Sequence, residues 1–287
     1  MRVLVIGKTG QVATELAALA PDAVCLGRDG AEMSDPEGAG VAVGRALREA
    51  GAAAVINAAA YTAVDRAEED EALADAVNGV APGAIARACA GAGIPLVHIS
   101  TDYVFDGSGR APRPPDAPTA PLGVYGRTKL AGEEAVRAAD GVHAILRTSW
   151  VFSPHGANFV KTMLRLSETR DTLSIVADQI GGPTSARAIA AACLRIAARL
   201  QEAPALSGTY HFAGAPDVSW ADFARAIFDA AGRRVAVRDI PSSDYPTPAA
   251  RPLNSRLDCR TTESAFAIAR PDWRIDLRDT LNAMGAA

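Results

Sequence analysis

The chain has 287 residues, 49% of them hydrophobic and 22% charged, and a formal net charge of -4. This length allows one large domain or two small ones, with enough residues to bury a real core. The acidic balance argues against nucleic acid or an anionic membrane as a partner. No apolar run approaches the roughly 18 residues of a membrane-spanning helix, so we predict no membrane association.

The cysteines indicate a reducing compartment. Cys25, Cys89, Cys193 and Cys259 lie far apart, and the chain has no Cys-x-x-Cys pair. Free thiols therefore fit the pattern better than a disulfide framework or a zinc site. Met1 leads directly into a strand-like run without a basic leader, and we expect a cytoplasmic protein.

A glycine-containing turn follows the first predicted strand. Residues 2–6 are uniformly apolar, and the pattern G-x-x-G-x-x-A over residues 7–13 runs into an amphipathic helix over 12–19. Glycines at Gly7 and Gly10 let the backbone approach a pyrophosphate, while the helix N-terminus offers N–H groups and a partial positive charge. The arrangement strand, glycine turn, helix predicts a dinucleotide-binding loop.

The second predicted strand, residues 23–26, ends where a ribose-binding acid is usually found. This chain has Arg28 close to that place, and a guanidinium tolerates a 2′-phosphate. We therefore predict NADPH, with NADH as the alternative if Arg28 faces solvent and Asp29 takes the acidic role. Glu32 and Met33 are expected to line the adenine.

The next segments continue the βα alternation. Strands are predicted over residues 53–57, 95–100 and 143–148, with a long helix over 69–92 between the first two. Ligands of doubly wound sheets bind at the carboxyl ends of the strands. Thr101 stands at such an end, where its hydroxyl could bind a substrate carbonyl. The alternation predicts a parallel sheet with helices on both faces.

Tyr125 and Lys129 are four residues apart, so on a helix they share one face about one turn apart. A cation beside a phenol stabilises the phenolate, and we expect Lys129 to lower the pKa of Tyr125 by about three units. Such a phenol exchanges a proton with a carbonyl or alcohol oxygen. Only three of the 29 basic residues are lysines, which favours a specific role for Lys129. The alternative is an exposed helical pair without a function.

After Trp150 the pattern loosens into a smaller lobe. The fold class is therefore α/β, a Rossmann-type doubly wound parallel sheet with a smaller C-terminal substrate-binding lobe. We assign residues 1–150 to the NAD(P)-binding domain, with parts of 168–203 rejoining the sheet, and 151–287 to a discontinuous substrate-binding lobe. Helices are expected from Asn158, over 185–200, 219–231 and 277–284, and strands over 172–176 and 209–212.

Eight sequence blocks in chain order resemble the dTDP-4-dehydrorhamnose reductases, a family of the extended short-chain dehydrogenase/reductase superfamily. The resemblance runs along nearly the whole chain. The blocks are Gly-Lys-Thr-Gly-Gln (7–11), Asn-Ala-Ala-Ala-Tyr-Thr-Ala-Val-Asp (57–65), Ser-Thr-Asp-Tyr-Val-Phe-Asp-Gly (100–107), Val-Tyr-Gly-Arg-Thr-Lys-Leu-Ala-Gly-Glu (124–133), Arg-Thr-Ser-Trp-Val (147–151), Asn-Phe-Val-Lys-Thr (158–162), Asp-Gln-x-Gly-x-Pro-Thr (178–184) and Arg-Pro-x-Asn-Ser-Arg-Leu (251–257).

The resemblance implies NAD(P)H-dependent reduction of dTDP-4-dehydro-6-deoxy-L-mannose to dTDP-L-rhamnose. It gives Tyr125 the role of proton donor to the C-4 oxygen, Lys129 that of holding the nicotinamide ribose, and Thr101 that of orienting the carbonyl. The implied cofactor contacts are Gly10, Gln11, Val12, Ala60, Tyr61 and Thr62. The implied sugar-nucleotide contacts are Thr101, Asp102 and Trp150, with Arg251 and Asn254 near the pyrophosphate or base.

One departure concerns a metal. Some relatives form a dimer bridged by magnesium, using a glutamate of the first helix and carboxylates of the helix after the Gly-x-Pro-Thr loop. Glu15 is present, but residues 185–191 contain no acid. We therefore predict no metal site, and a monomer or a metal-free homodimer. The histidines at 98, 143, 155 and 211 show no ligand spacing and are expected to be structural or exposed.

Two alternatives stay open at this point. One is another sugar-nucleotide epimerase or dehydratase of the same superfamily, which oxidises and re-reduces its substrate with bound cofactor. The other is a non-catalytic, reductase-like regulatory subunit. Stoichiometric NADPH consumption separates the reductase from both.

Overall fold

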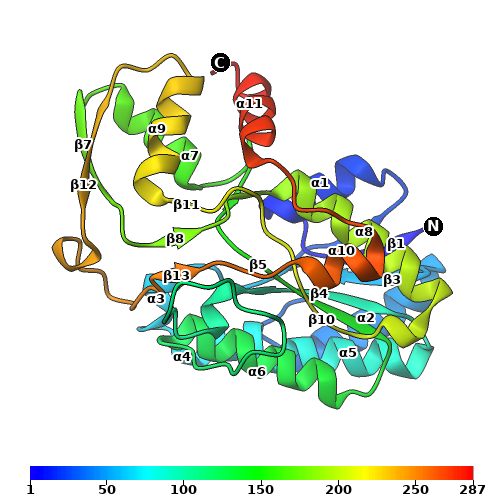
Figure 1. Cartoon of the computed structure of the whole chain (residues 1–287). Helices are drawn as coiled ribbons and strands as arrows, with labels where there is room; N and C mark the ends of the chain where they lie inside the picture. Colours follow the sequence, from blue (N-terminus) through cyan, green and yellow to red (C-terminus); the bar gives the residue numbers. More distant parts are fainter. Residues whose placement is uncertain (287) are drawn as a thin grey trace.

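The structure, a computed structural model, describes residues 1–286. Its centre is a six-stranded sheet in the order β10-β5-β4-β3-β1-β2, and all the pairings are parallel (Figure 1). The order reverses between β1 and β3, the place where doubly wound sheets bind ligands. The strands are β1 (Val3–Ile6), β2 (Val24–Leu26), β3 (Ala54–Asn57), β4 (Leu96–Thr101), β5 (His143–Thr148) and β10 (Gly208–His211).

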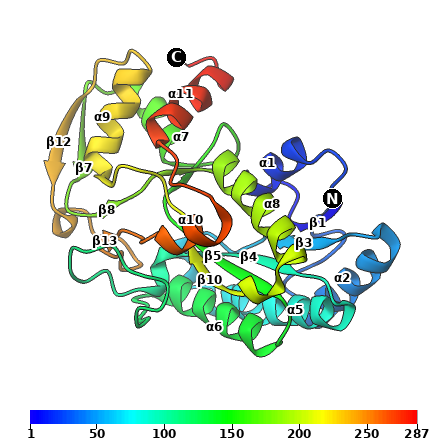
Figure 2. The same ribbon diagram turned by 45° about the vertical axis from the view of Figure 1, so that its right-hand side comes forward.

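Helices cover both faces of the sheet (Figures 1 and 2). Apolar side chains of both helical layers pack against the strands in two buried clusters, which explains why the central strands are apolar along their length. One layer contains α1 (Gln11–Leu19), α8 (Ala186–Glu202) and α10 (Arg260–Phe266), and the other α2 (Pro36–Ala50), α5 (Ala81–Ala92) and α6 (Val124–Ala138). The predicted doubly wound α/β fold is confirmed.

The predicted helix over 69–92 is interrupted. It consists of α4 (Glu71–Asp75), the π-helical turn η1 (Ala76–Val80) and α5. Within the π turn, the Asn78 side chain accepts from the backbone N–H of Tyr61 at 2.8 Å and donates to its carbonyl at 3.0 Å. The π turn thus fastens the loop after β3, and the sequence pattern did not predict this interruption.

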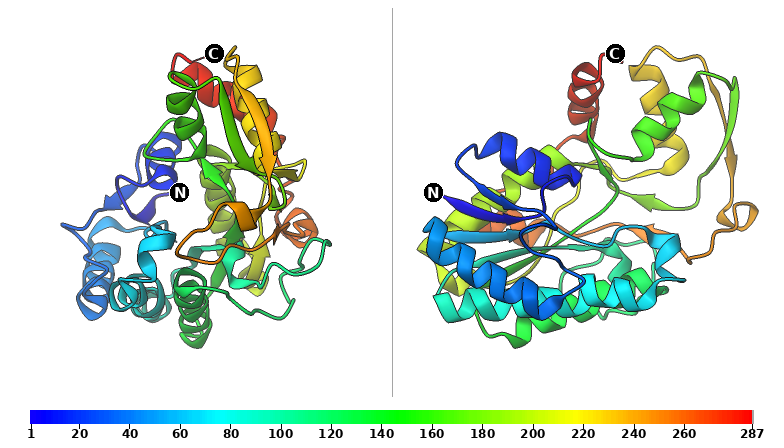
Figure 3. Two further views of the ribbon diagram at one scale, coloured as in Figure 1. Left: turned by 90° about the vertical axis from the view of Figure 1, so that its left-hand side faces the viewer. Right: turned by 180° about the vertical axis from the view of Figure 1, so that it is seen from behind.

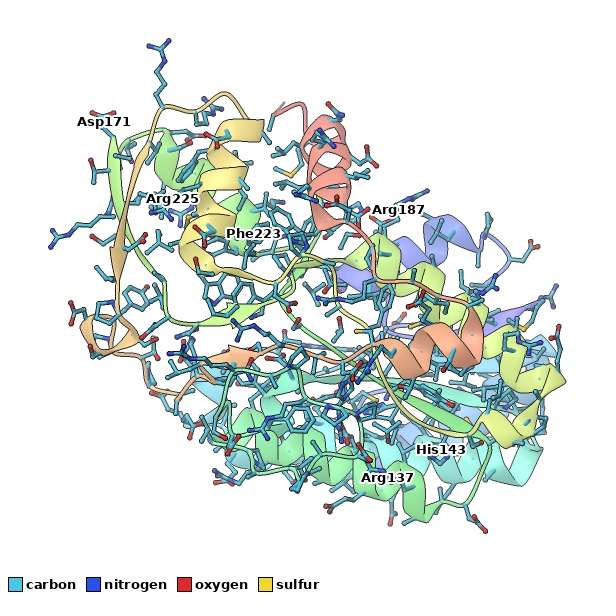
Figure 4. All side chains as sticks on the ribbon, in the orientation of Figure 1. Arg137, His143, Asp171, Arg187, Phe223 and Arg225 are labelled. Atoms are coloured by element: carbon cyan, nitrogen blue, oxygen red, sulfur yellow. The ribbon has the colours of Figure 1, made fainter. Side chains whose placement is uncertain are left out.

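The remaining elements form the smaller lobe, seen from two further sides in Figure 3. Its core contains buried Phe152, Phe223 and Trp273, and Figure 4 labels Phe223 on α9. The lobe contains α7 (Phe159–Ser167), α9 (Trp220–Ala230) and α11 (Trp273–Ala283), and the parallel pair β7 (Thr172–Val176) and β12 (Ala236–Ile240). Sequence reasoning predicted β7 but missed β12 and α10, and it began α11 one turn too late.

Short strands join the lobe to the sheet domain. The chain returns to the main sheet through α8 and β10, so the returning strand lies just beyond the 168–203 span expected to rejoin it. The connecting pairs are β6 (Val151–Phe152) with β9 (Thr184–Ser185), and β8 (Ile180–Gly181) with β11 (Val218–Ser219) and β13 (Asn254–Ser255). Among residues 1–286, no helix is long and apolar enough to cross a bilayer.

A buried ion pair holds α6 on the sheet. Arg147 of β5 donates to both carboxylate oxygens of Glu133 of α6, at 2.8 and 2.7 Å, and the two residues are 2% and 0% exposed. Ser100 of β4 donates to Glu133 at 2.6 Å, and Arg137 adds a fourth contact at 2.7 Å. These hydrogen bonds satisfy two charges that would otherwise be costly to bury.

We expect Arg147→Met to lower the free energy of unfolding by about 3–5 kcal/mol, because it leaves the Glu133 carboxylate buried without its main partner. Urea denaturation measures the loss. Replacing both partners, as Glu133→Leu with Arg147→Met, should recover much of it. The control is Arg199→Met, which breaks an exposed pair with Glu202 and should cost less than about 1 kcal/mol. Equal losses in the two single variants would contradict this account.

Candidate active site

The carboxyl ends of the central strands bring the predicted site segments to one edge of the sheet. The glycine turn follows β1, the 58–62 loop follows β3, Thr101 ends β4, and Trp150 follows β5. Parallel strands end at the same edge, so residues distant in sequence meet there. The edge therefore carries the dinucleotide loop and the polar residues of the predicted chemistry together.

The glycine turn has the geometry of a pyrophosphate cradle. Gly7 has a φ of 116°, and a Cβ there would approach Ala13 Cβ at 3.3 Å. Gly10 is the N-cap residue of α1, and a Cβ added to it would meet nothing within 4 Å. No side chain of the described chain caps this helix end, so its first N–H groups remain available to an anion. These features fit the cofactor that the sequence predicts.

Gln11 links this turn to the smaller lobe. Its Oε1 accepts from Ser153 Oγ at 2.8 Å and from Asn158 Nδ2 at 2.9 Å. Asn158 in turn caps α7 by accepting from the backbone N–H of Lys161. The carbonyl end of the Gln11 amide is therefore occupied, which leaves its NH₂ group for other contacts.

The segment after β2 leaves Arg28 exposed at the sheet edge. Glu32 accepts from the Ser34 backbone N–H and hydroxyl, at 3.0 and 2.9 Å, and these bonds lower the pKa of Glu32. Met33 is 5% exposed and packs in the core under β1. The Arg28 side chain is thus accessible to a phosphate, and Met33 contributes mainly apolar packing.

Thr101 and Asp102 end β4 in a buried position. Thr101 Oγ1 donates to Asp102 Oδ1 at 3.2 Å, and Asp102 Oδ2 is a buried oxygen without a partner in the described residues. Burial raises the pKa of Asp102 to about 6, although hydrogen bonds from Ser255 and Thr101 act in the opposite direction. An unsatisfied buried carboxylate oxygen costs stability, and such a cost is typical of a functional site.

Tyr125 projects from the first turn of α6. Its ring packs edge-to-face on Tyr103, with ring centroids 5.4 Å apart. A Cβ on Gly126 would lie 2.3 Å from the Tyr103 carbonyl oxygen, so glycine is needed for this close approach. The contact fixes the direction of the phenol toward the end of β4.

The expected effect of Lys129 on Tyr125 is wrong for this structure. Burial raises the pKa of Tyr125 to about 12, Asp102 adds to the rise, and a hydrogen bond with the Thr101 side chain opposes it. The Lys129 nitrogen instead donates to the carbonyl of Ile99 at 2.8 Å and lies 3.4 Å from His98 Nε2. Burial also lowers the pKa of Lys129 to about 8, which weakens its effect as a fixed charge.

Trp150 has a strained backbone, with a φ of 51° for a residue that carries a Cβ. Its ring stacks on Trp220 of α9, with centroids 3.6 Å apart and an interplanar angle of 10°. Trp220 is held in turn by a hydrogen bond from its indole N–H to Gln179. The stack joins the end of β5 to the lobe and fixes the direction of Trp150.

The two predicted contacts from the C-terminal segment already have partners inside the protein. Arg251 forms a bidentate pair with Asp65, at 2.9 and 2.8 Å. The Asn254 side chain donates to the carbonyl of Ala111 at 2.9 Å and accepts from Arg256. Their predicted contact with a substrate pyrophosphate or base stays a prediction, and Asn254 in particular serves to hold a loop.

Glu15, the metal ligand expected in some relatives, already has two side-chain partners. Its carboxylate lies 3.2 Å from Arg187 Nη1 and 3.3 Å from His155 Nε2. Arg187 is on α8, next to α1 (Figure 4). Arg187 therefore lies in the 185–191 segment, where some relatives have metal-binding carboxylates.

Sequence reasoning assigned no role to Asn57, and it expected His98 to be structural or exposed. Asn78 holds the Tyr61 loop, and His98 and Asn57 lie behind Lys129. The signal that could have found His98 is strand alternation. His98 and Ser100 are two residues apart on β4, so both face the same helix, α6.

A parallel sheet with a glycine cradle and a Tyr-x-x-x-Lys helix at its carboxyl edge defines a dinucleotide-dependent oxidoreductase of the short-chain dehydrogenase/reductase type. A family model described as "RmlD substrate binding domain" matches residues 1–286. The chain belongs to this family.

Similar proteins agree with this assignment. A dTDP-4-dehydrorhamnose reductase of Sinorhizobium fredii is 45% identical, over 97% of this chain and 96% of the relative. The crystal structure of one from Clostridium acetobutylicum superposes with a TM-score of 0.90 at 33% identity, covering 99% of this chain and 100% of the other. Another, from Bacillus anthracis in complex with NADP, gives 0.89 at 32% identity, covering 98% and 99%. The resemblance drawn from the sequence blocks is confirmed.

The unsatisfied Asp102 carboxylate generates a stability prediction. We expect Asp102→Asn to raise the free energy of unfolding above pH 6, by on the order of 2 kcal/mol, because the fold disfavours the charged carboxylate. Its folded-state pKa, about 6, is above the ordinary 3.8. The gain should therefore be absent below about pH 4, where the acid is protonated in both states, and should develop between pH 4 and 6.

Urea denaturation at several pH values measures this gain. The control is Asp22→Asn at an exposed position, which should change stability little at any pH. A pH-independent effect of Asp102→Asn would contradict the electrostatic explanation.

Proposed function

We propose that this chain reduces the 4-keto group of dTDP-4-dehydro-6-deoxy-L-mannose with NADPH, giving dTDP-L-rhamnose, and that Tyr125 is the proton donor. The observation that carries the proposal is the place of the Tyr125 phenol, whose ring packs on Tyr103 just after Thr101 ends β4, at the strand edge that also holds the glycine cradle. A carbonyl placed between the Thr101 and Tyr125 hydroxyls is both oriented and protonated. The dTDP-4-dehydrorhamnose reductase relatives support this choice of substrate.

The high pKa of Tyr125 suits the reductive direction. A phenol with a pKa near 12 is fully protonated at neutral pH and thus ready to donate. An oxygen that becomes an alkoxide is a stronger base still, since even water has a pKa of about 15.7. Proton transfer from Tyr125 is therefore favourable without a lowered pKa, and Thr101 stabilises the phenolate that remains.

The bound nicotinamide would supply the hydride. Gly7, Gly10, Gln11 and Val12 would hold its pyrophosphate at the N-terminus of α1. The other proposed cofactor contacts are Arg28, Glu32 and Met33 after β2, Ala60, Tyr61 and Thr62 after β3, and Tyr125 and Lys129 on α6. Lys129 donates one N–H to the Ile99 carbonyl, and its remaining donors would serve the ribose hydroxyls.

The sugar nucleotide would lie between the strand edge and the lobe. We assign its contacts to Thr101, Asp102 and Trp150, with Arg251 and Asn254 at the outer end. Trp150 supports this assignment because its stack with Trp220 spans the two parts of the protein. An apolar ring held rigidly in this place suits a 6-deoxy sugar, whose methyl group needs an apolar contact.

Two further points complete the proposal. We infer a monomer or a metal-free homodimer, supported by the Arg187 and His155 contacts of Glu15. Four free cysteines support a reducing, cytoplasmic site of action. An epimerase or dehydratase of the same fold would regenerate its cofactor, so continuous NADPH consumption by this chain would exclude that alternative.

We expect Tyr125→Phe to lower kcat for NADPH oxidation with the keto-sugar by about 10²–10⁴-fold, because it removes the proton donor and keeps the ring. Cofactor affinity, measured by nucleotide fluorescence, should stay within about twofold, since the ring still fills its place. The control is Tyr210→Phe, which removes a phenol bonded to the Leu206 carbonyl on the distant strand β10. Full activity in Tyr125→Phe would refute the assignment.

The cofactor preference gives a separate test. Arg28→Ala should raise KM for NADPH roughly tenfold or more and KM for NADH by less than about twofold, because only NADPH offers the 2′-phosphate to a charge-assisted hydrogen bond. Steady-state kinetics with both nucleotides measure the ratio. Arg45→Ala, at an exposed arginine of α2, is the matched control. Equal changes in KM for both nucleotides would show that Arg28 does not bind the 2′-phosphate.

A further inference from the structure

Asn57, His98 and Lys129 form a buried chain of polar contacts that the proposed reaction does not yet explain. Asn57 Nδ2 lies 3.1 Å from His98 Nδ1, and His98 Nε2 lies 3.4 Å from Lys129 Nζ. Asn57 and His98 are fully buried, and Lys129 is 2% exposed. The three side chains come from β3, β4 and α6, so this series of contacts runs from the sheet interior to the proposed site.

A backbone amide determines which groups donate and which accept in this series of contacts. The Ala59 N–H donates to Asn57 Oδ1 at 3.2 Å, and an N–H can face only an acceptor. The Asn57 NH₂ group must therefore point at His98, whose Nδ1 accepts. Burial lowers the pKa of His98 well below its ordinary value, so the ring is neutral. A neutral imidazole with an accepting Nδ1 carries its proton on Nε2, on the side of Lys129.

We propose that Asn57 and His98 are positioning residues for Lys129, which aim the Nε2–H of His98 at the lysine nitrogen and favour its neutral amine over its ammonium. An ammonium has three N–H donors and no lone pair, so only the amine accepts this N–H. Both the amine and the ammonium can donate the hydrogen bond from Lys129 Nζ to the Ile99 carbonyl. The inference deepens the proposed function, because it sets the pH range in which Lys129 is charged.

Other groups around Lys129 act on the same equilibrium. Burial lowers the pKa of Lys129 to about 8, and the Glu133 carboxylate acts in the opposite direction. Arg147 neutralises much of that carboxylate through two hydrogen bonds. The titratable or charged groups facing this region are Tyr125 and Glu133 on α6, His98 on β4, Asp102 after β4, and His143 and Arg147 on β5. Of these, His98 alone directs a neutral N–H at the nitrogen.

The scarcity of lysine allows a direct test. The chain has only Lys8, Lys129 and Lys161, so protein labelled with ¹³C at lysine Cε gives three NMR signals, assigned with Lys8→Arg and Lys161→Arg. Titration of these signals in the full-length protein reports the charge of Lys129 without any turnover. Long-range ¹H–¹⁵N correlations of histidine-labelled protein report which nitrogen of His98 carries the proton.

We expect His98 to be protonated at Nε2 in the wild type, and Lys129 to titrate below the range of an exposed lysine. Asn57→Leu keeps the branched shape and frees His98 to move its proton to Nδ1 and offer Nε2 as an acceptor. The titration midpoint of Lys129 should then rise by about one pH unit, the effect of one net hydrogen bond. His98→Leu, which removes the N–H, should raise it as well.

The control is His155→Leu, which removes an imidazole beside Glu15 and should leave the midpoint of Lys129 within a few tenths of a pH unit. A wild-type His98 protonated at Nδ1 overturns the proposal, even if both variants fail to fold. An unchanged or lowered midpoint in Asn57→Leu also overturns it. Absence of reductase activity in the wild-type protein would refute the proposed function, and the titration test would still be valid.

Discussion

The contact between α6 and strands β4 and β5 is the constraint on which the site depends. A helix that packs on a sheet normally buries an apolar stripe. Here Tyr125, Lys129 and Glu133 recur every four residues, so they project from one face as a polar stripe. Burial of that stripe is tolerable because each member meets a partner. The partners are Thr101 for Tyr125, His98 and the Ile99 carbonyl for Lys129, and Ser100 and Arg147 for Glu133.

Local sequence patterns explain why the fold could be predicted so well. Continuous apolar runs predicted β1, β3, β4 and β5 to within one residue, since a strand buried on both faces has no other pattern. A capping residue marks a helix start in the same way, since the helix expected from Asn158 begins there and Asn158 accepts from the Lys161 N–H at 3.2 Å. These signals are local, and the predictions made from them agree with the structure. The loop segments of the site were also predictable, because strand ends share one edge.

What the sequence could not predict depends on distant contacts. The π turn at Asn78 exists because its side chain holds Tyr61 and its backbone packs against Gly132, where a Cβ would lie 2.0 Å from the Asn78 carbonyl oxygen. The strand β12 has no apolar pattern, since it pairs only with β7 at the outer side of the lobe. The effect of Lys129 on the pKa of Tyr125 was misjudged for the same reason, because the groups that bury the two side chains come from separate elements.

The electrostatic correction changes how the chemistry works. A phenol with a lowered pKa serves oxidation and reduction alike, since it exchanges protons in both directions near neutral pH. In this protein, burial raises the pKa of both Tyr125 and Asp102 and lowers that of Lys129, so every one of these groups is biased toward its neutral form. Of the three groups only Tyr125 stays fully neutral at pH 7, and a phenol with so high a pKa gives up its proton readily only to a strong base such as an alkoxide. The burial that costs the fold stability at Asp102 thus also keeps Tyr125 in the protonated form that the reduction of a ketone requires.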